Sequence, residues 1–127
     1  MIPALYQYLT QHCQSVKTWY QYGLDLAGKA LPYGIIEVRA DQASLNNRRG
    51  AWEYVRLWVW FPRGSWLPVN AAIDEVQNLF LGVTLTRSTG GAFALEPVGA
   101  LAGVFDDQLV AFGRAIDFRV PVVRSVI

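Results

Sequence analysis

The segment from Ala51 to Phe61 constrains the fold most, because it is a predicted strand with two apolar faces. Side chains alternate between the two faces of a strand. One face holds Val55, Leu57, Val59 and Phe61. The other holds Trp52, Tyr54, Arg56, Trp58 and Trp60. Four large aromatic side chains carry about 600–1,000 Å² of surface, and monomers rarely expose apolar patches larger than about 300–600 Å². This second face therefore needs a cover, from another layer of this chain or from another subunit.

Composition limits the class of protein. The chain has 127 residues, which suits one domain with one core. Its hydrophobic content is 53% and its charged content 17%, yet no stretch approaches the roughly 20 apolar residues of a membrane span. The N-terminal residues lack the pattern of a signal peptide, and no membrane contact is expected. The net charge is +1, with Lys and Arg spread along the chain, which argues against a dedicated nucleic-acid binder.

Hydrophobic periodicity predicts two helices and several strands. Apolar residues recur at helical spacing from Pro3 to about Val16 and again from about Val69 to Leu81. The remaining predicted elements are an edge strand at Thr18–Tyr22, strands at Tyr33–Arg39, Trp52–Phe61 and about Arg114–Val123, and a hairpin around Ser88–Gly91. The stretch from Val98 to Phe105 is rich in Gly and Ala and is expected to be irregular.

This order of elements predicts a single α+β domain over residues 1–127. Its sheet is expected to be mixed or antiparallel, with the helices packed on one face. Pro121 cannot donate a hydrogen bond to a neighbouring strand. The last strand is therefore expected to lie at a sheet edge or to leave the sheet at Pro121.

The residues that could carry chemistry do not form a catalytic or metal-binding pattern. His12 and Cys13 are neighbours on a predicted helix, where adjacent side chains do not face each other. Cys13 belongs to the apolar stripe and is expected to be a buried packing residue; as the sole cysteine it has no internal disulfide partner, which fits synthesis in a reducing compartment. Asp106 and Asp107 are interpreted as turn or strand-entry residues. We expect no enzymatic activity, no cofactor and no metal site.

The arginines allow two interpretations. Arg39, Arg48, Arg49 and Arg63 gather near the ends of the two central strands, either as solvated loop charges or as a rim facing a partner or passing DNA. Arg56 lies among aromatic side chains. It either stacks on them through cation–π contacts or meets a carboxylate of another subunit.

The order of elements, with Leu31-Pro32-Tyr33 opening a strand, resembles the tail terminator and tail-completion (tail-to-head joining) proteins of long-tailed bacteriophages. The resemblance covers nearly the whole chain. It implies an α+β subunit of a virion structural protein, which assembles in the host cytoplasm into a homohexameric ring on the tail tube. Such a ring stops tube growth, offers a docking surface to the head–tail connector proteins, and surrounds the channel through which DNA passes without sequence-specific binding.

These considerations assign the candidate functional residues. The predicted subunit or partner interface comprises Trp52, Tyr54, Arg56, Trp58, Trp60 and Trp66. The predicted loop contacts to a neighbour, tube or channel are Arg48, Arg49 and Arg63.

Three alternatives stay open at the level of sequence. The first is a small-ligand-binding α+β domain in which the Trp/Tyr face lines a pocket. The second is another ring subunit of the head–tail connector. The third is an enzyme whose site is assembled between subunits. A monomeric state in solution would favour the pocket protein, whereas a ring requires self-association.

Overall fold

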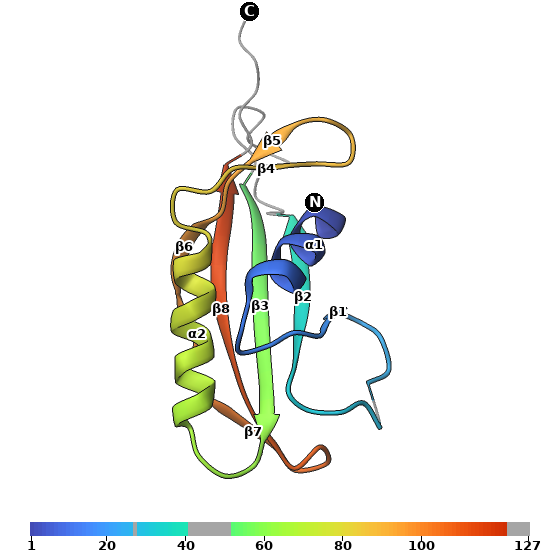
Figure 1. The fold of residues 1–127 in the computed structure, drawn as a ribbon, viewed down its shortest axis with the longest axis vertical. Coiled ribbons are helices and arrows are strands. Elements are labelled where there is room, and N and C mark those ends of the chain that lie inside the picture. The colour runs from blue at the N-terminus through green and yellow to red at the C-terminus, as the bar shows by residue number, and fades with distance from the viewer. Residues whose placement is uncertain (27, 41–51, 122–127) are drawn as a thin grey trace, which may run out of the picture.

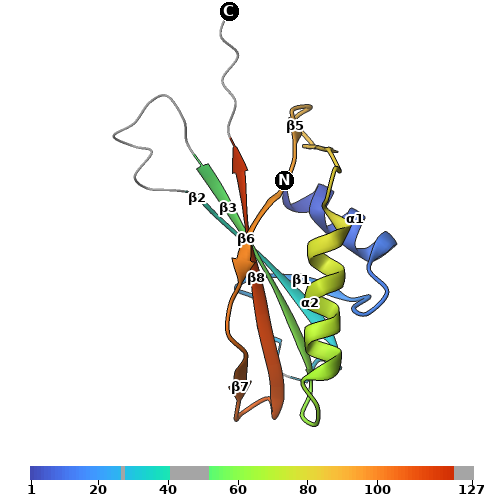
Figure 2. The same ribbon diagram turned by 90° about the vertical axis from the view of Figure 1, so that its left-hand side faces the viewer.

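Two helices pack on one face of a single sheet. The computed structural model describes residues 1–26, 28–40 and 52–121. Helix α1 (Ile2–His12) and helix α2 (Leu67–Leu79) lie on the same side of the sheet, and the opposite side carries no helix (Figures 1 and 2). The predicted α+β class, with helices on one face of a mixed sheet, is confirmed.

The sheet has six strands in the order β1-β2-β3-β8-β6, with β7 also paired to β8. Their bounds are β1 Trp19–Gln21, β2 Tyr33–Ala40, β3 Trp52–Pro62, β6 Glu96–Ala100, β7 Val104–Asp106 and β8 Ala111–Pro121. Strand β1 runs parallel to β2, and all other neighbours are antiparallel. The predicted edge strand near Tyr20 is therefore present as β1.

A small hairpin closes the end of the molecule where helix α2 finishes. It pairs β4 (Leu85–Thr86) with β5 (Ala92–Phe93), as the sequence predicts (Figure 1). Phe93 and Leu95 are buried in the main core. Arg87 donates to Glu53 of strand β3 at 2.9 Å and lies over the Phe93 ring at 5.1 Å. The hairpin is thus attached to the sheet by both apolar and charged contacts.

The main core fills the space between the helices and the sheet. Val55, Leu57 and Val59 of β3 are fully buried there, on the face that the alternation predicts. Leu5 and Leu9 of α1 and Val69, Ala72, Ile73 and Val76 of α2 meet them. The Tyr8 hydroxyl donates to the carbonyl of Leu79 at 2.6 Å, which joins the two helices directly.

Both helices differ from the predicted bounds for local reasons. Helix α1 ends at His12 rather than near Val16, because Cys13 has an extended backbone and Glu75 accepts hydrogen bonds from the N–H groups of Gln14 and Ser15. Helix α2 begins at Leu67, since Pro68 fits the first turn, where its missing N–H has no intrahelical role.

Two sheet predictions are wrong. The stretch from Val98 to Phe105 is not irregular, because most of it belongs to β6 and β7, which both pair with β8. Strand β8 therefore does not lie at an edge of the sheet. Pro121 itself still pairs with Trp52, and the residues after it lie outside the described part of the chain, so the alternative that the strand leaves the sheet there stays a prediction.

Three tryptophans lie flat against glycines. A Cβ atom at Gly34 would clash with the Trp19 ring, and one at Gly113 would clash with the Trp60 ring. At Gly103, an added Cβ would come within 2.6 Å of the Trp66 ring. Trp66 also stacks on Phe112, with ring centroids 4.3 Å apart. Because these glycines have no side chain, the indole rings pack directly on the backbone.

We expect Gly34→Ala and Gly113→Ala each to reduce the free energy of unfolding by about 1–3 kcal/mol, because the added methyl group displaces a packed indole. Urea denaturation measures the loss. Gly64→Ala is the matched control: a Cβ there meets nothing within 4 Å, and we expect a change below about 0.5 kcal/mol. Equal stability of all three variants would contradict the close packing.

Candidate interaction surface on the open sheet face

The sheet face opposite the helices is the candidate interaction surface, here called the open face. It presents Tyr33, Ile35, Glu37 and Arg39 of β2, Tyr54, Arg56, Trp58 and Trp60 of β3, and Ala111, Gly113, Ala115, Asp117 and Arg119 of β8. Neither helix nor the β4–β5 hairpin lies on this side (Figure 2). The small residues of β8 stand opposite the tryptophans, since Trp58 pairs with Ala115 and Trp60 with Gly113.

One end of the open face is covered by this chain's own loops. Trp60 is only 9% exposed and forms a second cluster with Tyr33 and Ala111. Leu26 and Leu31 from the β1–β2 connection and Leu109 from the β7–β8 turn pack against this cluster. Trp60 therefore belongs to a core of the monomer, and the chain itself supplies part of the cover that the sequence requires.

The centre of the open face combines an indole with an ion pair. Arg56 donates two hydrogen bonds to Asp117 of the neighbouring strand, at 2.7 and 3.0 Å, and its guanidinium lies 5.9 Å from the Trp58 ring centre. The bonds to Asp117 raise the pKa of Arg56 and outweigh the opposing effect of burial. The carboxylate that meets Arg56 is thus in the same chain, and the predicted stacking on an aromatic ring is also present.

Charges on the open face are paired with opposite charges. Besides Arg56 and Asp117, Arg119 meets Glu96 at 2.9 Å and Arg39 meets Glu37 at 3.3 Å. The Trp58 indole N–H also donates to Glu37 at 3.4 Å. The face is therefore close to neutral, although it carries many ionised groups.

The other predicted interface residues lie in different places. Trp66 packs on the helix side of the sheet, where it is half-buried against Phe112. Arg63 is exposed in the turn after β3, with its guanidinium 5.9 Å from the Phe105 ring centre. Trp52 pairs with Pro121 in the ladder. Arg48 and Arg49 lie outside the described residues.

The most exposed apolar side chains of the sheet lie at its β6–β7 edge, which sequence reasoning missed. Val98, Val104 and Phe105 are 58%, 44% and 42% exposed. Trp58 and Tyr54 are only partly exposed. Alternation identifies the face on which a side chain lies, but only the position of β6 and β7 shows that these residues form an uncovered edge.

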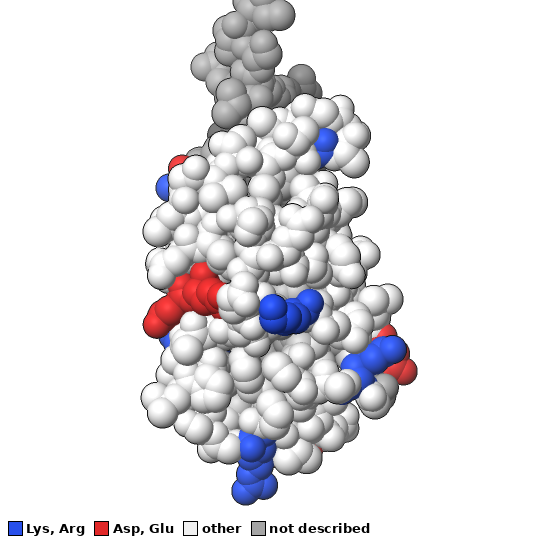
Figure 3. All heavy atoms as spheres, in the orientation of Figure 1, with Lys and Arg blue, Asp and Glu red and all other residues white. Residues whose placement is uncertain are grey.

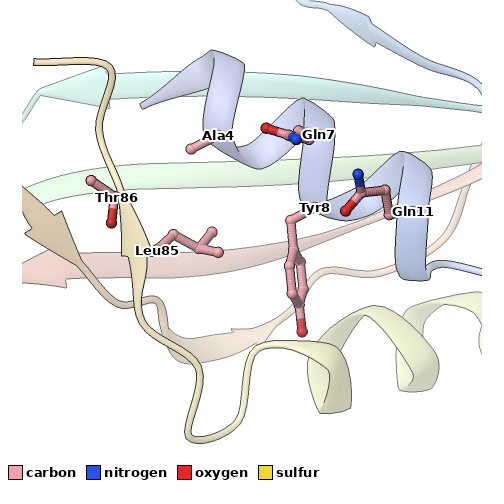
Figure 4. A pocket seen from close by; sticks show the side chains of 6 residues that line it. All are labelled: Ala4, Gln7, Tyr8, Gln11, Leu85 and Thr86. Carbon is pink, nitrogen blue, oxygen red and sulfur yellow. The ribbon is translucent and has the colours of Figure 1, made fainter. Parts of the chain in front are cut away.

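Hollows lie on both sides of the sheet. On the open face, a shallow pocket of about 370 Å³ is bounded by the β1–β2 connection and the β7–β8 turn, with Tyr33 and Trp60 in its lining. On the other side, a groove of about 250 Å³ separates α1 from β4, where Ala4, Gln7, Tyr8 and Gln11 face Leu85 and Thr86 (Figure 4). Among the described residues that line this second groove, Tyr8 is the only one with an ionisable group.

Cys13 is a buried packing residue, as predicted. It is 1% exposed, and its thiol donates to Glu75 at 3.5 Å. Burial raises the pKa of Cys13 to about 11, with a further contribution from the Glu75 charge. Burial alone would raise the pKa of Glu75, but hydrogen bonds from Ser15, Gln14 and Cys13 lower it. Glu75 thus joins α2 to the segment after α1, and the His12 side chain points elsewhere, against the Tyr8 ring.

The described residues offer few other sites for chemistry. Within them, no three His, Cys, Asp or Glu side chains gather where a metal ion would bind. Asp106 accepts hydrogen bonds from the N–H groups of Gln108 and Leu109, the predicted turn role. The helix-bearing side shows scattered charges and no concentrated basic patch (Figure 3). No helix of the described part of the chain has the length and apolar character needed to cross a membrane.

Comparison with known proteins adds no relative. No protein-family model matches the chain, and no curated protein matches it.

The burial of the Cys13 thiol can be tested by measuring the free energy of unfolding at alkaline pH. The pKa of the thiol is about 11 in the folded protein and 9.0 in its unperturbed state. The resulting stabilisation is complete below pH 9 and is lost as the pH rises toward 11, by about 2 kcal/mol. We therefore expect the free energy of unfolding to fall more steeply over this range in the wild type than in Cys13→Ser. If the free energy of unfolding fell equally with pH in the two proteins, the thiol would not be buried.

Proposed function

We propose that this chain is a non-enzymatic structural subunit that associates with copies of itself through the open face. The observation that supports this most is the one-sided packing of the helices (Figure 2). It leaves Arg56 and Trp58 at the centre of a sheet face that no helix covers. The exposed Val104 at the β6–β7 edge extends the same contact surface, since it pairs with Gly113 of the open face.

The pairing of charges favours contact between identical subunits. A face that carried one sign of charge would repel its own copy. On the open face, Arg56, Arg39 and Arg119 each have a carboxylate partner within the chain. Two copies can therefore approach without burying an unpaired charge, which would be strongly unfavourable.

Within this class, we propose the role that the resemblance implies. The subunits form a ring, with six copies expected, that caps a bacteriophage tail tube and joins it to the head connector. The partners are the tube protein and the connector proteins, and the site of action is the head–tail junction of the virion. The near-neutral charge suits a channel through which DNA moves, because a strongly basic wall would bind its phosphates.

The pocket beside Tyr33 and Trp60 supports a second candidate function. Ligand sites are concave and mostly apolar, with a few polar groups that orient the ligand. This pocket has that composition, and its volume of about 370 Å³ lies in the range of small-molecule sites. The second candidate is a small-ligand-binding domain that uses the covered end of the open face.

We expect Trp58→Ala to convert the wild-type oligomer into smaller species while lowering the free energy of unfolding by only about 1–2 kcal/mol, because this indole is partly exposed. Sedimentation velocity and chemical denaturation give the two readouts, and electron-microscopy class averages of the wild type should show rings.

Two variants serve as controls. Tyr6 is 50% exposed on helix α1, away from the open face, so Tyr6→Ala should preserve the oligomer. Trp60→Ala should instead unfold the monomer readily, with a loss of about 3–5 kcal/mol for a buried tryptophan. A wild-type chain that sediments as a monomer, alone and with purified tail tubes, would overturn the ring proposal.

A further inference from the structure

The pocket at the covered end of the open face is lined by apolar walls and acidic groups. Its walls include Leu26, Leu109 and the Trp60 ring. Asp25 and Asp106 also line it, whereas no Lys or Arg among the described residues does. The Asp106 carboxylate in this lining favours a cation that carries an apolar part over an anion.

Tyr33 adds a hydroxyl group that has no hydrogen-bond partner among the described residues. Its side chain is 1% exposed, and the hydroxyl makes no hydrogen bond within the described part of the chain. Buried hydroxyls are nearly always paired. No side-chain oxygen of the described residues is both sealed from solvent and unpaired, so this hydroxyl opens onto the pocket. Burial and the nearby charge of Asp106 raise the pKa of Tyr33, which keeps the phenol protonated.

Asp106 is held in place with capacity to accept further bonds. Its Oδ1 atom accepts two backbone hydrogen bonds, each 2.9 Å long, from Gln108 and Leu109. These bonds fix the carboxylate at the start of the β7–β8 turn. Asp106 forms no ion pair with any described Lys or Arg, and an ionised carboxylate has about four acceptor positions.

We propose that this pocket binds an alkylguanidinium or alkylammonium group. The cationic head meets the Asp106 carboxylate and the Tyr33 hydroxyl oxygen, and the alkyl stem lies along Leu26, Leu109 and Trp60. Arg and Lys side chains bury their methylene stems in this way while their heads pair with anions. The inference goes beyond the ring proposal and gives the second candidate function its class of ligand.

The test is calorimetric titration with n-butylguanidinium and with n-butylurea, its neutral counterpart of similar shape. We expect the guanidinium to bind the wild type at least tenfold more tightly than the urea. Asp106→Asn keeps an oxygen that can accept the backbone hydrogen bonds of the turn but removes the negative charge. It should therefore abolish the preference for the guanidinium over the urea. Tyr33→Phe should weaken guanidinium binding by several-fold.

Asp107→Asn is the matched control, because Asp107 is adjacent and exposed but does not line the pocket. Equal binding of the two probes to the wild type, or the same effect of Asp106→Asn and Asp107→Asn, would overturn the inference. Binding of both probes without a preference would leave the second candidate function intact while removing its cationic ligand.

Sedimentation in the presence of the guanidinium distinguishes two sources of the group. If a side chain of a second copy occupies the pocket, the free probe competes with it, and both the probe and Asp106→Asn reduce self-association. If the natural ligand is a small molecule, the sedimentation coefficient is unchanged while the probe binds. Either result supports the inference, and neither depends on whether the oligomer is a ring.

Discussion

The packing of indole rings on glycine is the constraint on which this structure depends. A tryptophan covers a large area of neighbouring backbone only where the residue beneath it has no side chain. Gly34 allows Trp19 to close the helix side of the sheet, and Gly113 allows Trp60 to lie flat on the open face. The sheet can therefore carry large aromatic side chains on both faces.

Because of this packing, the aromatic face exposes less apolar surface than its sequence suggests. Its tryptophans suggest a large exposed apolar patch, but loops and small β8 residues cover Trp60 within the monomer. What stays accessible is a mixed surface in which Trp58 lies beside the Arg56–Asp117 ion pair. Surfaces of this kind favour specific association over nonspecific aggregation, because a partner that buried the charged groups without complementary polar groups would bind unfavourably.

Sequence alone predicted the elements whose residues repeat with a clear period. These are the two helices and strands β2, β3 and β8, while β1 and the β4–β5 hairpin followed from aromatic and turn residues. It did not predict β6 and β7, because Gly and Ala have low strand propensity. These segments form strands because they pair with the free edge of β8, which the local sequence does not reveal. The burial of Trp60 also depends on loops far away in sequence. The pocket was not predictable for the same reason, because Tyr33 and Asp106 meet only after the sheet has formed.

The central position of β8 has a consequence for how the chain folds during synthesis. Strands β2 and β3 are available early. The second neighbour of β3 is β8, which spans Ala111–Pro121 and also pairs with β6 and β7. Until the ribosome releases that segment, β3 presents an unpaired edge with Trp and Val side chains. Such edges promote association between nascent chains. Folding is thus expected to be a late, non-local event, with a slow rate typical of sheets built from distant segments.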